Sequence, residues 1–294
     1  GAEGAQPASG ADGRRGVRLV KQLHVVPLHW RTVAALSLVS LVGLVAFFWP
    51  FFVSPASVAA DHASDAPWFF ALLLPLVVAV LFADIAGGGL DAKGVAMLAV
   101  LAAVATALRP LGAGVAGLEP MFVILLLGGR ALGPAFGFAL GSLSLFTSAL
   151  LTAGVGPWLP FQMVAAGWFA MGAGLLPQIR GRAEIAMLVA YGALASLAYG
   201  LLMNLSFWPW ALGADSALSF VPGAPLSENL GRWLAFTLAT SLGWDVPRAV
   251  LTAVLTLLAG PVLLRAVRRA TRRAAFEAPV RFEPAASAAS GARN

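Results

Sequence analysis

The chain has 294 residues, of which 60% are hydrophobic and 11% charged, and its mean hydropathy is +0.86. A water-soluble chain of this length needs more polar surface than 19 basic and 13 acidic residues provide, so the composition excludes a soluble globular protein. The net charge of +6 does not indicate nucleic-acid binding, because the basic residues lie at segment ends and in the tails. We therefore predict an all-α protein that crosses a membrane several times.

Apolar runs predict the membrane crossings in chain order. We expect eight crossings, with seven possible. The short run 119–129 reaches only about half the hydrocarbon thickness at 1.5 Å per residue, so it is either broken or extended by its neighbours through a buried Arg130. Residues 229–244 predict either an outer-surface helix or the first part of the last crossing. We expect residues 1–30 to form a flexible, basic N-terminal tail. We expect residues 266–294 to form a C-terminal tail that is first basic and then disordered. The expected crossings are 33–52, 68–85, 94–108, 119–129, 132–151, 161–176, 185–205 and 246–264.

The basic residues predict the orientation, because Lys and Arg near crossing ends resist translocation. Only three of them, Arg109, Arg232 and Arg248, fall on the outer side of the predicted topology. The cluster from Arg265 to Arg273 favours anionic lipid headgroups or a docking partner. Both termini are therefore expected in the cytoplasm. The residues on that side are Arg14, Arg15, Arg18, Lys21, Arg31, Lys93, Arg130, Arg180, Arg182, Arg265, Arg268, Arg269, Arg272 and Arg273.

Small residues recur at four-residue spacing in two runs. Gly129, Gly133, Gly137 and Gly141 are predicted to share one helix face, which another backbone can approach closely. Ala99, Ala103 and Ala107 give a second smooth face, on the 94–108 crossing. This alanine face is suited either to packing within the chain or to a partner.

Aromatic and polar residues gather at the predicted outer ends of the crossings. Tryptophans there form an interfacial belt or stack on a flat ligand. Arg109 and Glu119 bracket a glycine-rich loop, where they either are solvated or paired with each other, or anchor a polar ligand group.

A binding site is predicted where the 109–119 loop, the 156–162 turn and the 204–210 helix exit converge. Pro157 and Pro160 hold the turn, so that Trp158 faces the cavity and Gln162 enters one turn below it. Amide side chains offer both donors and acceptors, which suits an amide-rich or heteroaromatic ligand, and two tryptophans are expected to close over the top. The candidate substrate-binding residues are Arg109, Glu119, Trp158, Phe161, Gln162, Asn204, Trp208 and Trp210.

Motifs for catalysis and for ATP binding are absent from the chain. It has no G-x-x-x-x-G-K-[ST] phosphate cradle, no H-E-x-x-H and no G-x-S-x-G. It has no cysteine, and His24, His29 and His62 share no ligand spacing, so neither a metal nor a cofactor is expected. Asp84 and Asp91 flank a glycine-rich turn, and we interpret Asp91 as a helix N-cap rather than a catalytic group. We predict a protein that is not an enzyme.

Three consecutive segments together resemble the substrate-binding S components of energy-coupling-factor (ECF) vitamin transporters. They are LDAKGVAMLAVLAAVATALRP, LEPMFVILLLGGRALGPAFGFALGSLSLFTSALL and GPWLPFQMVAAGWFAMGAGLLP. The resemblance implies a six-helix core over about 91–265, in a bacterial plasma membrane, with a pocket open to the outside near 158–162. It implies capping loops at 109–118 and 206–228. It also implies docking, through Ala99, Ala103 and Ala107, to a coupling membrane subunit that carries two ATPases.

The chain departs from that pattern by an extra transmembrane hairpin over residues 31–90, which could cover the alanine face. A hairpin of this kind is similar to that of members associated with corrinoid uptake, which implies cobalamin as the ligand, followed by riboflavin or another water-soluble vitamin. Two alternatives remain, a self-sufficient secondary transporter and a membrane-embedded lipid-modifying enzyme. The first needs ionisable residues near the midplane, and the second needs a cluster of intramembrane carboxylates or histidines.

Overall fold

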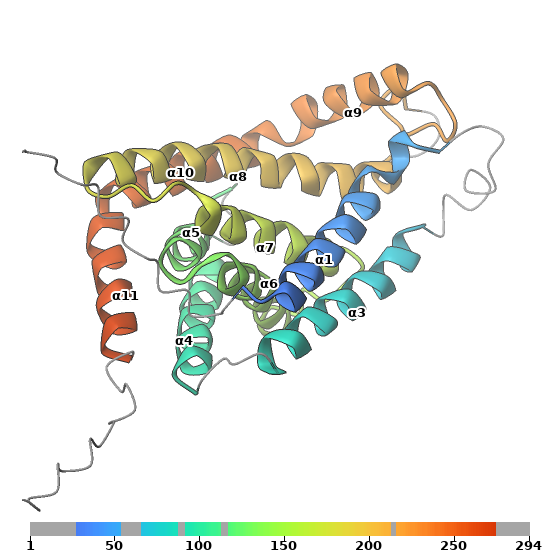
Figure 1. Ribbon diagram of the computed structural model, residues 1–294. Coiled ribbons are helices and arrows are strands. Elements are labelled where there is room, and N and C mark those ends of the chain that lie inside the picture. The colour runs from blue at the N-terminus through green and yellow to red at the C-terminus, as the bar shows by residue number, and fades with distance from the viewer. Residues whose placement is uncertain (1–27, 54–65, 88–91, 113–116, 213–215, 275–294) are drawn as a thin grey trace, which may run out of the picture.

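The computed structural model describes residues 28–53, 66–87, 92–112, 117–212 and 216–274, and within them all regular secondary structure is helical, without a strand (Figure 1). The predicted all-α membrane architecture is confirmed. The α-helices are α1 (Trp30–Phe48), α3 (Ala66–Gly87), α4 (Ala92–Leu108), α5 (Met121–Leu132), α6 (Pro134–Leu151), α7 (Leu159–Leu175), α8 (Arg182–Ala211), α9 (Leu226–Thr240), α10 (Leu242–Leu258) and α11 (Gly260–Ala274), and the 3-10 turns are η1 (Trp49–Phe51) and η2 (Arg109–Gly112).

Fewer helices have membrane-spanning length than the eight or seven expected. In the described part of the chain five helical segments are long and apolar enough, and the pair α9–α10, bent by 69°, makes a sixth if it counts as one span. Helices α5 and α7, of 12 and 17 residues, are shorter. The expected crossing 246–264 is wrong, because Gly260 and Pro261 break it after Leu258 and an arginine-rich helix follows. The 229–244 stretch belongs to the separate helix α9 and the start of α10.

The centre of the bundle is the close packing of α5 and α6 against α7. Gly133, with φ of 99°, separates α5 from α6, so the expectation of four glycines on one continuous helix is wrong. Close backbone approach is nevertheless confirmed. A Cβ on Gly129 would lie 1.9 Å from the carbonyl oxygen of Ala170, and one on Gly141 would lie 2.2 Å from that of Ala166. Only glycine fits at these two positions.

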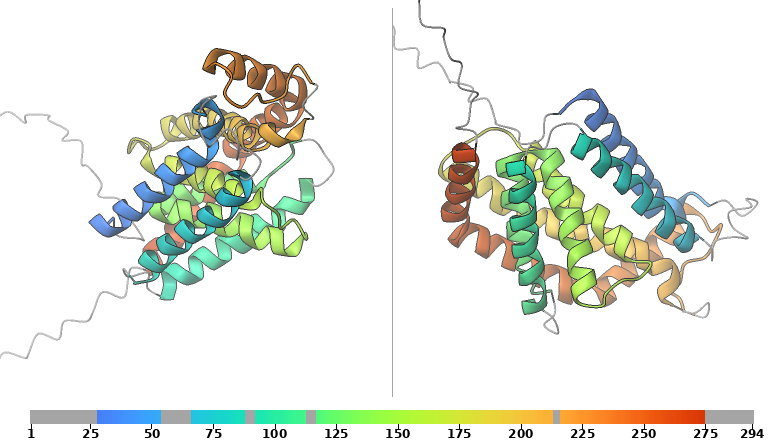
Figure 2. Two further views of the ribbon diagram at one scale, coloured as in Figure 1. Left: turned by 90° about the vertical axis from the view of Figure 1, so that its right-hand side faces the viewer. Right: turned by 90° about the horizontal axis from the view of Figure 1, so that it is seen from below.

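The extra hairpin of α1 and α3 packs against α7, on the flank of the bundle opposite α11 (Figures 1 and 2). Thr32 donates a hydrogen bond to Asp84 across the hairpin at 2.7 Å. Trp168 Nε1 on α7 donates to Ser40 Oγ on α1 at 3.0 Å, which attaches the hairpin to the core.

The alanine face lies on the opposite side of α4 from its packing partners. Helix α4 packs on α5 and α6 through residues such as Ala102 and Ala105, which are buried. Ala99, Ala103 and Ala107 are exposed. The hairpin packs on α7 and therefore does not cover this face.

Candidate functional site

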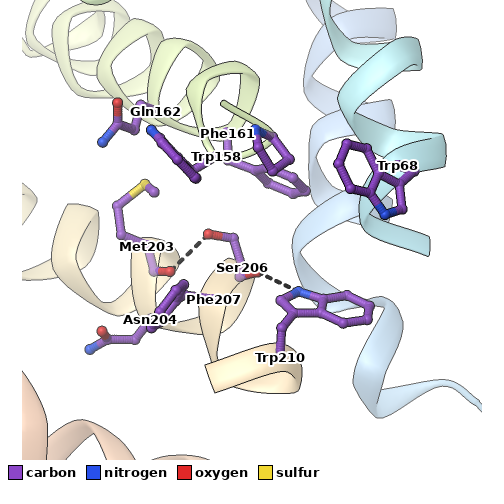
Figure 3. A pocket seen from close by; sticks show the side chains of 10 residues that line it. Trp68, Trp158, Phe161, Gln162, Met203, Asn204, Ser206, Phe207 and Trp210 are labelled. Atoms are coloured by element: carbon purple, nitrogen blue, oxygen red, sulfur yellow. Dashed lines mark hydrogen bonds between the residues drawn. The ribbon is translucent and has the colours of Figure 1, made fainter. Parts of the chain in front are cut away.

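A cavity of about 640 Å³ lies between α3, the start of α7 and the last turns of α8 (Figure 3). Its volume is within the range of pockets for drug-sized ligands. Most of its wall is aromatic or aliphatic, with a few amide and hydroxyl groups. The side chains that line it include Trp68 from α3, Trp158, Phe161 and Gln162 around the start of α7, and Met203, Asn204, Phe207 and Trp210 from α8.

The predicted turn before α7 brings two candidate residues to this cavity. Trp158 precedes α7, and Pro160 lies in the first turn of that helix, where a missing N–H costs no hydrogen bond. The Trp158 Nε1 donates to the carbonyl of Gly154 at 3.1 Å, and its ring lies over Gly156. These contacts hold the ring at the cavity, with Gln162 one turn further along the helix, as the sequence predicts.

Arg109 and Glu119 are not paired with each other. Arg109 donates to Ser148 Oγ at 3.3 Å and to Gln162 Oε1 at 3.4 Å, so it lies directly beside the cavity wall. Glu119 instead forms an ion pair with Arg248. The alternative of a mutual Arg109–Glu119 pair is therefore wrong, because Glu119, which precedes α5, pairs with Arg248 on α10. Residues 113–116 of the loop between them lie outside the described residues.

Trp208 does not close over the cavity as expected. It lies on another side of α8 from Phe207 and Trp210, and it is fully buried. Its Nε1 donates to the carbonyl of Leu218 at 2.7 Å, and its ring packs edge-on against Phe220. Trp208 therefore anchors the segment after α8. Part of the expected 206–228 capping loop, residues 213–215, lies outside the described residues.

Sequence reasoning missed the contribution of the hairpin to this cavity. Trp68 of α3 lines it directly. Trp49, just after α1, stacks on Trp210 with ring centroids 5.6 Å apart, and Phe47 packs edge-on against Phe161 at 5.2 Å. The sequence places these aromatics at helix ends but carries no signal of which helices lie side by side.

A second cavity, of about 470 Å³, lies between the last turns of α8 and the helices α9 and α10, and it shares Met203, Asn204 and Phe207 with the first. Arg248 on its wall forms ion pairs with Glu119 and with Asp245, the latter at 2.8 Å. The guanidinium also lies over the rings of Phe122 and Tyr199, 5.7 and 5.2 Å from their centroids. The signal for this cluster was available, because Asp245 and Arg248 are three residues apart and share a helix face.

Asn204 belongs to the walls of both cavities. Its Oδ1 accepts a hydrogen bond from Ser241 Oγ at 2.7 Å, whereas its Nδ2 is buried and has no partner. A buried amide donor without a partner costs free energy that a bound acceptor recovers. Asn204 is therefore the best placed group to bond a polar ligand atom.

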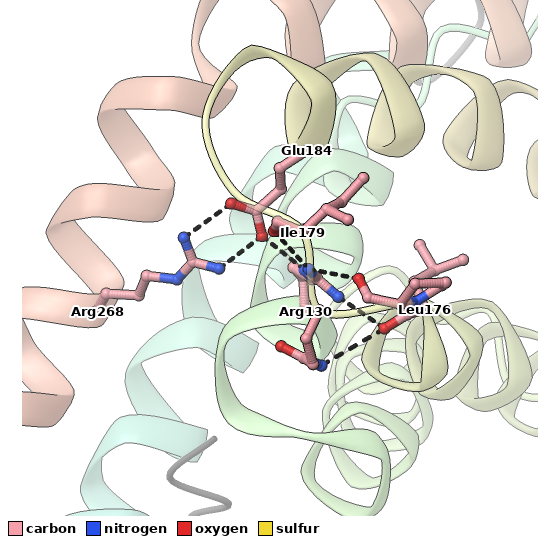
Figure 4. A network of polar contacts seen from close by, with 7 residues as sticks. Arg130, Leu176, Ile179, Glu184 and Arg268 are labelled. Atoms are coloured by element: carbon pink, nitrogen blue, oxygen red, sulfur yellow. Dashed lines mark hydrogen bonds and ion pairs between the residues drawn. The ribbon is translucent and has the colours of Figure 1, made fainter. Parts of the chain in front are cut away.

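A charged network lies at the opposite ends of α7 and α8 (Figure 4). Arg130, fully buried, donates through Nε to Glu184 at 2.7 Å and through its other nitrogens to the carbonyls of Leu176, Pro177 and Ile179. Arg268 on α11 binds both oxygens of Glu184, at 2.6 and 3.0 Å. The expected buried Arg130 is confirmed, and Glu184 is its missed counterion.

Fold and cavities define a multi-pass α-helical membrane protein with a ligand-sized pocket at one end of its bundle and a buried charge network at the other. The family model of the ECF transporter, substrate-specific component, matches residues 93–260, more than half of the chain. The chain belongs to this family, whose members are transporter subunits that work with ECF membrane and ATPase subunits. No curated protein and no solved structure matches it.

Proposed function

We propose that this protein is the specificity subunit of an ATP-driven vitamin importer and that it binds its vitamin in the 640 Å³ cavity. The observation that carries the proposal is the position of this cavity, at one common end of α7 and α8 within the matched family region. The opposite end carries Arg130, Arg180 and Arg182, which favours a cytoplasmic location for that end and an outer location for the cavity.

The wall chemistry narrows the ligand class. The aromatic rings on three sides of the cavity are suited to stacking on a flat heteroaromatic group, and Gln162 and Asn204 supply hydrogen-bonding amides. A volume of about 640 Å³ is more suitable for a flat vitamin such as riboflavin than for the larger corrin macrocycle of cobalamin. Cobalamin remains the second candidate, supported by the likeness of the extra hairpin to that of corrinoid-associated members.

Energy for release is proposed to come from partner subunits. The exposed alanines of α4 form a face without bulky side chains, which suits close packing with a coupling membrane subunit that carries two ATPases. A secondary transporter or a lipid-modifying enzyme is the alternative. The buried charges of the described helices argue against both, because they are paired with one another in the Glu119–Arg248–Asp245 and Arg130–Glu184–Arg268 clusters.

Binding is tested by equilibrium dialysis of the purified full-length protein with riboflavin and with cyanocobalamin. Gln162→Ala and Trp158→Phe are expected to weaken binding by about tenfold to a hundredfold, the effect of removing one polar or stacking contact. Matched controls lie at the other end of the bundle. Gln178→Ala and Trp30→Phe should bind as the parent does. Parental affinity in both cavity variants would show that the vitamin binds elsewhere.

A further inference from the structure

A third cavity, of about 670 Å³, lies at the arginine-rich end of the bundle, between the start of α8, the end of α10 and α11. One part of its wall is apolar, formed by Ile185, Leu257 and Leu264. The rest carries four guanidinium groups, those of Arg180 and Arg182 before and at the start of α8 and those of Arg265 and Arg268 on α11. Apolar and cationic surfaces thus face the same space.

The positive charge of this cavity is only partly neutralised. Glu184 is the one carboxylate among its lining residues, and it is already bound by Arg130 and Arg268. Arg180, Arg182 and Arg265 are exposed, and they form no ion pair within the described part of the chain. Their charge is free for an anionic ligand.

The position of α11 determines which ligand can reach the cavity. Helix α11 packs mainly on α5 and follows α10, with Leu264 buried, and Thr271 donates to Met97 Sδ of α4 at 3.8 Å. Arg265, Arg269 and Arg272 are exposed. A basic amphipathic helix of this kind lies at the membrane surface, where lipid headgroups and acyl chains are both within reach.

We propose that this cavity is a binding site for an anionic phospholipid. The phosphate is held by Arg180, Arg182 and Arg265, whose guanidinium groups suit phosphate oxygens, and an acyl chain lies along Ile185, Leu257 and Leu264. A free phosphate would use the arginines but leave the apolar wall uncovered, so the combined surface favours a lipid. The bound lipid joins α11 to the start of α8 beside the Glu184–Arg268 ion pair.

The test measures lipid binding to the purified full-length protein by native mass spectrometry, with dioleoyl phosphatidylglycerol and dioleoyl phosphatidylcholine as probes. The parent is expected to retain phosphatidylglycerol in preference. The double variant Arg180→Gln/Arg265→Gln should bind it about tenfold to thirtyfold more weakly, since it removes two of the three charge-assisted contacts proposed for the phosphate in the cavity. Neither side chain holds another element in place, so folding should be unaffected, and Arg180→Lys/Arg265→Lys should recover part of the affinity.

The matched control removes the same charge outside the cavity. Arg269→Gln/Arg272→Gln lies on the same helix α11, on residues that do not line the cavity, and should retain the parental preference for phosphatidylglycerol. Equal losses in both double variants would show general attraction to a basic surface and overturn the site. Competition by inorganic phosphate at equal concentration would assign a free-anion site instead, and a parent without preference for phosphatidylglycerol would also refute the proposal.

Discussion

The two ends of α7 and α8 are built from opposite chemistry. At the ends near Trp158 and Trp210, aromatic rings stack around a cavity and one buried amide lacks a partner. At the other ends, Arg130 and Glu184 are buried and form an ion pair with each other. Arg130 also donates hydrogen bonds to nearby backbone carbonyls. A region that must accept a ligand keeps unfilled space and an unsatisfied donor, whereas a region that must hold helices together satisfies its polar groups internally.

The largest expected effect comes from breaking the charged end. Arg130→Met should lower the free energy of unfolding by about 3–5 kcal/mol, because it leaves Glu184 and three carbonyls buried with fewer partners. Reversible unfolding of the purified protein in mixed detergent micelles measures this change. Arg232→Met is the control, since its partner Glu228 lies in an exposed pair on α9 that should contribute less than about 1 kcal/mol. Equal losses in the two variants would contradict a structural role specific to the buried network.

A smaller effect is expected at the aromatic end. Trp68→Ala and Trp49→Ala should each weaken vitamin binding by roughly tenfold, because the first removes a cavity wall and the second removes the ring that supports Trp210. Equilibrium dialysis measures the change, with Trp30→Ala as a matched control on an exposed tryptophan far from the cavity.

This second prediction separates two possible failures. If the hairpin variants bind as the parent does while Gln162→Ala does not, the vitamin site belongs to the matched core alone and the hairpin is dispensable. If none of these variants changes binding, the cavity itself is not the vitamin site.

The smallest effect on ligand affinity and on stability is expected from Ala103→Trp. Ala103 is exposed on α4 and contributes to neither cavity, so ligand affinity should stay within about twofold and stability within about 0.5 kcal/mol of the parent. Assembly with the coupling and ATPase subunits should be strongly reduced, because close helix approach in lipid depends on small side chains.

Co-purification of the partner subunits measures assembly. Leu76→Trp adds similar bulk to an exposed position of the hairpin and should leave assembly intact. Loss of vitamin binding in Ala103→Trp with assembly retained would place Ala103 in the ligand site rather than at a partner interface.

The contacts that the sequence predicted are those it encodes locally. Pro157 and Pro160 constrain the turn before α7, and this is why Trp158 and Gln162 reach the cavity as expected. The glycines of α5 and α6 predict close packing, and in the structure they lie against the backbone of Ala170 and Ala166 on α7. The expected position of Trp208 is wrong because a residue at the end of a helix can face any side, and only the packing of the following segment selects one.

The sequence by itself determined that this is a helical membrane protein, roughly where its helices lie, and which short runs bear small or aromatic residues, because apolar length and turn chemistry are local properties. The tertiary structure alone decided the partners over long separations. Arg248 pairs with Glu119, Arg130 with Glu184, and Trp49 with Trp210, each across more than fifty residues. No periodicity in the chain encodes such pairs, since they follow from how the helices pack against one another.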